Sequence, residues 1–137
     1  MCARYTACHF LKMSLNNTIS KEIGAKGEKI AAKYLRDNGY IILKRNWRDR
    51  YGEVDIIAEG KDNIVFVEVK TRSENALVSG AEAIDEKKMR LIRNEAVMFT
   101  KRLNTDLEPR IDVAEVTLIK SKDGKDEWKI KYIKDAF

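Results

Sequence analysis

Two acidic residues and a lysine, set within hydrophobic runs of the chain, are the side chains best suited to chemistry. Asp55 lies in the run Val-Asp-Ile-Ile, and Glu68 and Lys70 lie in the run Phe-Val-Glu-Val-Lys. Carboxylates in such strands need a counter-charge or a metal ion, because an isolated buried charge is costly. Paired carboxylates suit a hard divalent cation, Mg²⁺ or Mn²⁺. These residue types therefore predict metal-assisted phosphodiester hydrolysis, in which Lys70 orients water or stabilises charge on phosphorus.

The hairpin expected around the Gly-Lys-Asp-Asn turn brings these side chains together. A turn centred on residues 61 and 62 places residue 59 opposite 64, Asp55 opposite Glu68 and Glu53 opposite Lys70. Strand alternation puts all four charged side chains on one face, and directly opposed β-carbons lie about 4.5–5.5 Å apart. The competing interpretation is a surface ion pair, since a Glu-x-Lys triplet is common on strands. For Glu53, exposure at the start of the strand is the stronger interpretation.

Periodicity predicts the elements that must hold this hairpin. Apolar residues recur at helical spacing up to Gly39, which is an expected left-handed helix cap. We expect one α/β domain at 19–137, with a mixed sheet flanked by helices, after a loose extension at 1–18. The expected helices span about 20–38 and 85–102. The expected strands span about 40–44, 53–59, 64–70, 111–119 and 128–133. We also expect a loop at 71–80, a break at Pro109 and a turn at 122–124.

Composition excludes several classes of site. The only histidine, His9, and both cysteines, Cys2 and Cys8, lie in the first nine residues. The rest of the chain therefore cannot supply a Cys/His zinc site, a Ser-His-Asp triad or a cysteine nucleophile. With no disulfide framework and no apolar run of about 18 residues, we expect a cytoplasmic protein that does not engage a membrane.

The charge balance favours a polyanionic partner. The chain has 27 Lys and Arg against 22 Asp and Glu, a net charge of +5, although a solvated basic surface explains this mild bias equally well. Trp47 could stack on a base or cover the sheet as a hydrophobic lid. Basic residues near the hairpin and at the start of the second helix are candidates for contacting nucleic-acid phosphates; we select Arg45, Arg48, Arg50, Arg72 and Lys88.

These motifs resemble a known family. The run at 52–58, Gly-Glu-Val-Asp-Ile-Ile-Ala, and the run at 66–72, Phe-Val-Glu-Val-Lys-Thr-Arg, closely resemble the YraN-like family of bacterial proteins. The Gly27-Glu28 pair and the segments 46–48 and 110–113 also fit, so the resemblance covers about 25–116. That family is similar to the archaeal-type Holliday-junction resolvases and to the PD-(D/E)xK restriction-endonuclease-like superfamily.

The resemblance implies a restriction-endonuclease-like core of order αβββαβ, here followed by a C-terminal strand, with a Mg²⁺-dependent (or Mn²⁺-dependent) nuclease site and often a homodimer. It matches Asp55 and Glu68 to the acids of the motif, Lys70 to its lysine and Glu28 to the helix glutamate of resolvases. It matches Lys88, with Lys87 as the alternative, to a basic residue of the second helix. We therefore predict a metal-dependent endonuclease acting on DNA, with branched DNA among its substrates. A non-catalytic nucleic-acid-binding module of the same fold, and a nuclease of RNA or single strands, are the alternatives.

Overall fold

The chain folds in the predicted order of helix, three strands, helix and two strands. The computed structural model describes residues 3–74 and 85–137, with side chains described from residue 18 onward. None of the helices in these ranges is long and apolar enough to cross a bilayer. The elements are α1 (Ala3–Asp37), β1 (Ile41–Arg48), β2 (Glu53–Glu59), β3 (Asn63–Ser73), α2 (Glu86–Leu103), β4 (Glu108–Ile119) and β5 (Glu127–Ile133).

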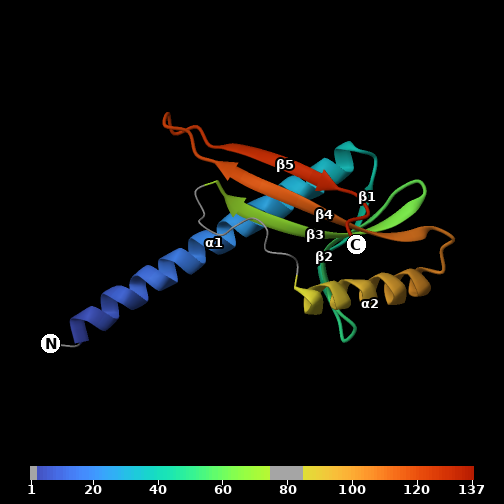
Figure 1. Cartoon of the computed structure of the whole chain (residues 1–137), viewed down its shortest axis with the longest axis horizontal. Helices are drawn as coiled ribbons and strands as arrows, with labels where there is room; N and C mark the ends of the chain where they lie inside the picture. Colours follow the sequence, from blue (N-terminus) through green and yellow to red (C-terminus); the bar gives the residue numbers. More distant parts are fainter. Residues whose placement is uncertain (1–2, 75–84) are drawn as a thin grey trace.

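One mixed sheet joins all five strands in the order β1-β2-β3-β4-β5 (Figure 1). β3 and β4 pair in parallel through the α2 crossover, and the other neighbouring strands pair antiparallel. In the β2–β3 ladder, Glu59 faces Ile64 and Ile56 faces Val67. The predicted hairpin register is therefore confirmed up to the pair that precedes Asp55 and Glu68.

Helix α1 is longer than predicted. It begins at Ala3 rather than near residue 20, and its amino-terminal part projects beyond the sheet (Figure 1). The expectation of a loose extension overlooked that residues 3–23 contain no Gly or Pro, so nothing in their propensities stops a helix. The predicted end is confirmed: Gly39 has φ +86°, and the N–H of Tyr40 donates to the carbonyl of Leu35 at 3.0 Å.

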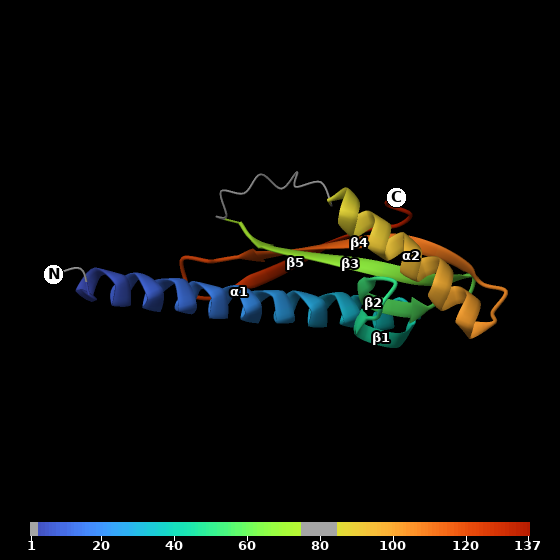
Figure 2. The same cartoon turned by 90° about the horizontal axis from the view of Figure 1, so that it is seen from below.

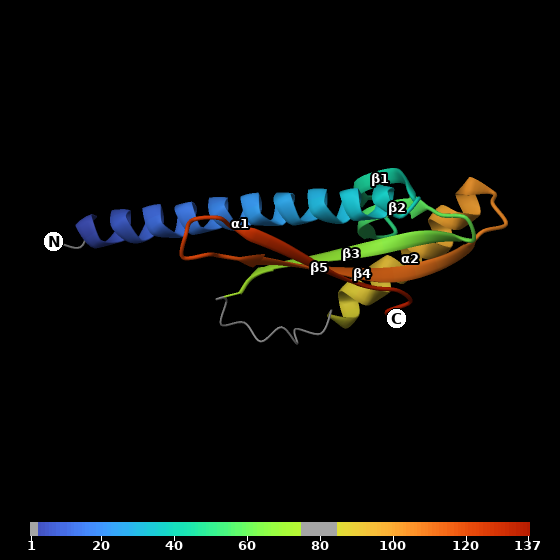
Figure 3. The ribbon, with the colours of Figure 1, turned by 90° about the horizontal axis from the view of Figure 1, so that it is seen from above.

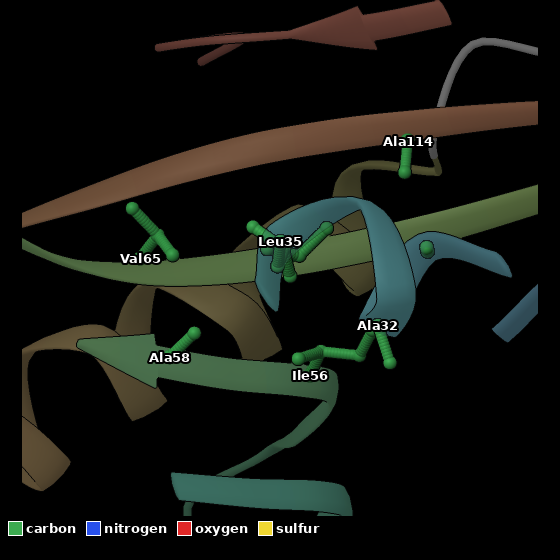
Figure 4. Close-up of a cluster of buried hydrophobic side chains, with 8 residues drawn as sticks. Ala32, Leu35, Ile56, Ala58, Val65 and Ala114 are labelled. Carbon is green, nitrogen blue, oxygen red and sulfur yellow. The ribbon is translucent and has the colours of Figure 1, made fainter. Parts of the chain in front are cut away.

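The two helices cover opposite faces of the sheet (Figures 2 and 3). Ala32 and Leu35 of α1 pack on one face (Figure 4), in the cluster that includes Ile56 and Val67. Ile92 and Phe99 of α2 pack on the other face, in the cluster that includes Val54, Ile57, Ile64 and Phe66. Two-sided burial explains why β2 and β3 are almost continuously apolar, and it makes a charged residue within them exceptional.

Three strands extend further than the sequence predicts. β1 continues through the basic segment to Arg48 because it pairs with β2 as far as Glu53. β3 continues to Ser73, since parallel pairing with β4 reaches Leu118, so the predicted loop at 71–80 is wrong for 71–73 and lies outside the described residues from 75. β4 begins at Glu108, and Pro109 lies at the second position of the strand rather than breaking the chain.

Candidate active site

The regular strand pattern is interrupted at Asp55. Val54 packs in the α2-side cluster and Ile56 packs in the α1-side cluster, although residues two apart on a regular strand share a face. On the neighbouring strand, Asn46 has φ +50° and lies between the paired residues Arg45 and Trp47. Both strands are thus distorted at the level of Asp55, a local irregularity of the kind that re-aims side chains near functional sites.

Asp55 is held by the backbone of β3. Its Oδ2 accepts a hydrogen bond of 2.8 Å from the N–H of Val69, the residue that follows Glu68. The paired ladder between β2 and β3 reaches Ile56 and Val67, so the carboxylate binds β3 just where that ladder ends. This bond fixes the orientation of Asp55 beside Glu68, as the predicted register requires.

Glu68 is a buried acid with one unsatisfied oxygen. The residue is 8% exposed; its Oε1 lies 3.5 Å from the Nζ of Lys88, and its buried Oε2 has no hydrogen-bond partner. Burial, together with the negative charge of Asp55, raises the pKa of Glu68 to about 7 despite the opposing effect of Lys88. A carboxyl with such a pKa changes charge near neutral pH, as general acids, general bases and metal ligands often do.

Glu53 and Lys88 complete the charged cluster. The Nζ of Lys88 lies 3.2 Å from Oε1 of Glu53, and the guanidinium of Arg48 donates to the other Glu53 oxygen. Hydrogen bonds from Arg48 and Lys88 lower the pKa of Glu53. The sequence interpretation of Glu53 as an exposed residue missed this role. The signal was present in the register, which placed Glu53 on the same face as the site.

Helix α2 begins where it must to deliver Lys88. The Asp85 side chain accepts the N–H of Lys87 at 3.2 Å, which caps the helix within one residue of the predicted start. Lys88 lies three residues after this cap, and its ammonium therefore reaches both Glu53 and Glu68. The structure thus brings this lysine, selected from the family resemblance, to the two acids.

Lys70 and Glu28 occupy different surroundings. Lys70 is half-buried on β3, two residues beyond Glu68, and faces Glu115 in the parallel register with β4. Glu28 is half-buried on α1, directly after Gly27, whose backbone approaches Thr71 of β3. Within residues 18–74 and 85–137, whose side chains the structure describes, no three acidic, His or Cys side chains form a group that could hold a metal ion. Glu28 therefore does not share one cluster with Asp55 and Glu68, and its catalytic role stays a prediction.

The acid pair nevertheless fits a hard divalent cation. Mg²⁺ commonly uses one or two carboxylates and completes its shell with water and substrate phosphate oxygens. Asp55 and Glu68 offer two carboxylates, and the buried Oε2 of Glu68 is an oxygen donor that the protein leaves unsatisfied. A positive charge between them would also relieve the repulsion that contributes to the raised pKa of Glu68.

A basic groove of about 440 Å³ adjoins the acids between the β1–β2 turn and the start of α2. Of the predicted nucleic-acid contacts, Arg48, Arg50 and Lys88 line it, whereas the exposed Arg45 and the half-buried Arg72 do not. Its lining comprises Arg48, Asp49, Arg50, Gly52, Glu53, Asp85, Lys87, Lys88 and Leu91. Four basic residues next to the acid pair form a surface that can hold a phosphate backbone.

Trp47 belongs to the core rather than to this groove. Its ring packs edge-on against Phe99, and its Nε1 donates to Oε1 of Glu95 at 2.8 Å. Of the two interpretations of Trp47, the structure supports the hydrophobic lid. Glu95 is fully buried and was not identified from the sequence, although its spacing from Ile92 and Phe99 places it on the apolar stripe of the helix.

Asp49 and Glu95 form a second acid pair behind the groove. Asp49 accepts the N–H groups of Tyr51 and Gly52 and pairs with Arg102 at 3.1 Å. Burial and the neighbouring Asp49 raise the pKa of Glu95. This pair anchors the β1–β2 turn, which carries Arg48 and Arg50, to α2.

Comparison with known proteins shows that these residues lie in a segment that a protein family shares. A family model described as "Uncharacterised protein family UPF0102" matches residues 27–116, a span that contains the acids and Lys88. A UPF0102 protein of Alkaliphilus oremlandii is 44% identical over 122 residues, which cover 87% of this chain and 100% of that protein. One from Syntrophomonas wolfei is 42% identical, with 87% and 100% covered, and one from Parabacteroides distasonis is 43% identical, with 85% and 92% covered.

Proposed function

The chain belongs to the uncharacterised protein family UPF0102, and we propose that it is a metal-dependent endonuclease that hydrolyses phosphodiester bonds in DNA. The observation that carries this proposal is the state of Glu68, a buried carboxylate beside Asp55 with an oxygen that has no partner. Buried polar atoms in folded proteins are normally hydrogen-bonded, so an unsatisfied one calls for an explanation such as a ligand or a catalytic role. The adjoining basic groove supplies a place for the phosphate backbone.

Each residue of the cluster has a distinct role in the proposal. Asp55 and Glu68 would hold Mg²⁺ or Mn²⁺, which when bound supplies a Lewis acid and a water of lowered pKa. The N–H of Val69 keeps Asp55 in position. Lys70 follows Glu68 by two residues on β3, so alternation directs both side chains to the same face, where the ammonium would stabilise charge on the phosphoryl oxygens.

The groove residues would position the substrate. Arg50 and Lys87 would hold phosphates next to the acids through charge-assisted hydrogen bonds. In the reaction, the oxygen of water bonds to phosphorus, one P–O ester bond breaks, and the products are a phosphate monoester and a hydroxyl end. The attacking water gives up a proton to solvent, and the departing oxygen takes up a proton from solvent to become the hydroxyl end.

A binding module without catalysis is the second candidate. It is favoured by the contact of Lys88 with Glu68, which offsets part of the negative charge without any metal. The lack of a three-acid metal group among the side chains described at 18–74 and 85–137 also favours it. Such a module would bind nucleic acid in the groove and leave it intact. The fold supports either function, so the distinction lies in the site.

Cleavage assays on labelled substrates test the proposal. The substrates are a four-way junction, a flap, a duplex and single-stranded DNA, with the corresponding RNA, each with Mg²⁺ or Mn²⁺. We expect the wild type to cut DNA and Asp55→Asn or Glu68→Gln to reduce the rate about 100-fold or more. Glu59→Gln, at the turn end of β2, is the matched control and should retain activity. Glu28→Gln tests the helix glutamate in the same assay.

Binding must be measured alongside cleavage. Fluorescence anisotropy with the same DNA should show that Asp55→Asn and Glu68→Gln still bind, because the basic groove is unchanged. Binding by the wild type without cleavage of any substrate would contradict the nuclease and support the binding module. Light scattering of the protein with junction DNA tests for the homodimer, which two symmetric cuts in one junction would require.

A further inference from the structure

Lys88 forms a bridge between two carboxylates of the proposed site. Its Nζ lies 3.2 Å from Oε1 of Glu53 and 3.5 Å from Oε1 of Glu68. Burial alone would lower the pKa of Lys88, but the charges of Glu68 and Asp55 outweigh that effect and raise it. The lysine is therefore protonated at physiological pH, and its ammonium lies between the carboxylates of Glu53 and Glu68.

A divalent cation bound by Glu68 would lie close to this ammonium. Mg²⁺ binds carboxylate oxygens at about 2.0–2.1 Å, and the ammonium already lies 3.5 Å from one oxygen of the same carboxylate. Two like charges a few ångströms apart in a partly buried site repel strongly.

The side chain of Lys88 also borders the basic groove, where its ammonium has room to move. Lys88 lines the basic groove, and its side chain is 31% exposed. Lysine has a long, flexible stem, so rotation about its own bonds would carry the ammonium from Glu68 into the groove without moving α2. There it would join Arg50 and Lys87 as a phosphate contact.

We propose that Lys88 is an internal counter-cation that a divalent metal displaces from Glu68, and that the displaced ammonium then binds substrate phosphate in the groove. This inference rests on the proposed function, because it requires a metal at Asp55 and Glu68. It makes metal binding and nucleic-acid binding cooperative, and each must strengthen the other by the same factor. In the metal-free protein, Lys88 would stay against Glu53 and Glu68 until the metal binds.

Titration calorimetry with Mg²⁺ alone tests the displacement. We would compare wild type, Lys88→Met and Lys88→Gln at pH 8.5, which is above the pKa of about 7 that Glu68 has beside Lys88. Removal of the competing ammonium should tighten Mg²⁺ binding about 3- to 10-fold, within the range of a partly exposed ion pair. Lys87→Met removes the same charge from the adjacent, exposed position of the groove and should tighten binding less than half as much. Glu68→Gln should abolish binding.

A second measurement tests the coupling. Anisotropy of a labelled, phosphorothioate-linked duplex should show that Mg²⁺ increases the DNA affinity of the wild type several-fold. The increase should fall by at least half on a logarithmic scale in Lys88→Met and Lys88→Gln, and it should persist in Lys87→Met.

The outcomes separate this inference from the proposed function. If Mg²⁺ binds the wild type and both Lys88 variants equally, or if Lys87→Met tightens binding as much as Lys88→Met, the displacement is wrong and the metal site stands. If Mg²⁺ binds none of the proteins, the metal site of the proposed function fails and the displacement fails with it. Tighter binding confined to the Lys88 variants, with loss of the coupling, supports the displacement.

Discussion

At the scale of single residues, burial and neighbouring charges shift the pKa values of two acids in opposite directions, although both acids contact Lys88. Glu68 has its pKa raised to about 7 by burial and by Asp55, whereas Glu53 has its pKa lowered by hydrogen bonds from Arg48 and Lys88. Glu53 is therefore a permanent anion that holds Lys88 in place. Glu68 is the acid whose charge responds to pH and to a bound cation.

The raised pKa of Glu68 predicts a stability that falls as pH rises. The folded protein keeps the Glu68 proton up to about pH 7, whereas the unfolded chain releases it near 4.5, so unfolding becomes easier across this window. Relative to Glu68→Gln, the wild type should lose on the order of 1–3 kcal/mol between pH 5 and pH 8. Urea denaturation of both proteins at the two pH values measures this difference. An equal difference at both pH values would contradict the assignment, and Glu59→Gln is the control.

The Trp47–Glu95 hydrogen bond predicts the cost of removing one hydrogen-bond donor from the core. Trp47→Phe keeps an aromatic ring against Phe99 but leaves Oε1 of the fully buried Glu95 without its donor. We expect a loss of about 1–3 kcal/mol in the free energy of unfolding, which is the cost of an unsatisfied buried polar group. Trp128→Phe, on the half-exposed strand β5, is the matched control. Equal losses in the two variants, by chemical denaturation, would show that the hydrogen bond contributes little.

At the scale of elements, the packing of α1 on β3 depends on one glycine. A β-carbon at Gly27 would lie 1.9 Å from Oγ1 of Thr71, so the helix backbone contacts the strand directly. Thr71 follows Lys70 on β3, and a shift of α1 would therefore disturb the strand that carries Glu68 and Lys70. The Gly27-Glu28 pair of the family motif thus has a packing role, whatever the chemical role of Glu28.

This contact predicts opposite effects for two glycine substitutions on the same helix. Gly27→Ala should destabilise the protein by about 1–3 kcal/mol, since the added methyl overpacks the α1–β3 contact. At Gly24 a β-carbon meets nothing within 4 Å, so Gly24→Ala should be neutral or stabilising by up to about 1 kcal/mol. Thermal unfolding followed by circular dichroism compares the two. Similar changes in both variants would contradict the close approach of α1.

At the scale of the whole molecule, two hollows at opposite ends of β2 both carry basic residues. One is the basic groove beside the acids; the other, of about 410 Å³, includes Lys61, Arg110 and Lys134. In the second hollow, the buried Asp112 accepts two hydrogen bonds from Arg110, each of 2.9 Å, and also the hydroxyl of Tyr132. Arg110 is therefore already paired, as Arg48 and Lys88 of the basic groove are paired with Glu53. The groove differs in adjoining Asp55 and Glu68, which makes it the proposed site for a phosphate backbone.

This difference predicts which surface controls the salt dependence of DNA binding. Arg50→Gln combined with Lys87→Gln should weaken binding and reduce the slope of log affinity against log salt by about 2, roughly 1 for each phosphate contact. Lys61→Gln combined with Lys134→Gln is the matched control, with the same loss of charge at the other hollow. Anisotropy from about 50 to 200 mM KCl measures both slopes. A larger change in the control would place the DNA on the other end of the sheet.

Much of the fold and half of the site follow from local sequence patterns. The register that joins β2 to β3 depends on one short turn and on strand alternation, so counting from residues 61 and 62 correctly paired Glu59 with Ile64 and predicted the approach of Asp55 to Glu68. Helix α2 was predicted within a residue at its start, because its cap and its apolar stripe are local features. The family resemblance identified Lys88, which no local pattern distinguishes from Lys87.

Tertiary structure alone decided the charge state of the site acids and where the strands β1 and β3 end. The pairing of Glu53 with Lys88, the burial of Glu95 under Trp47 and the unsatisfied oxygen of Glu68 all depend on where α2 lies across the sheet. The extensions of β1 and β3 depend likewise on partner strands that are distant in sequence. Alternation and turn geometry are determined by neighbours along the chain, whereas desolvation and ion pairing depend on groups that only folding brings within a few ångströms. The sequence by itself therefore determined which acids meet, and only the folded chain determined what charge they carry and which lysine balances them.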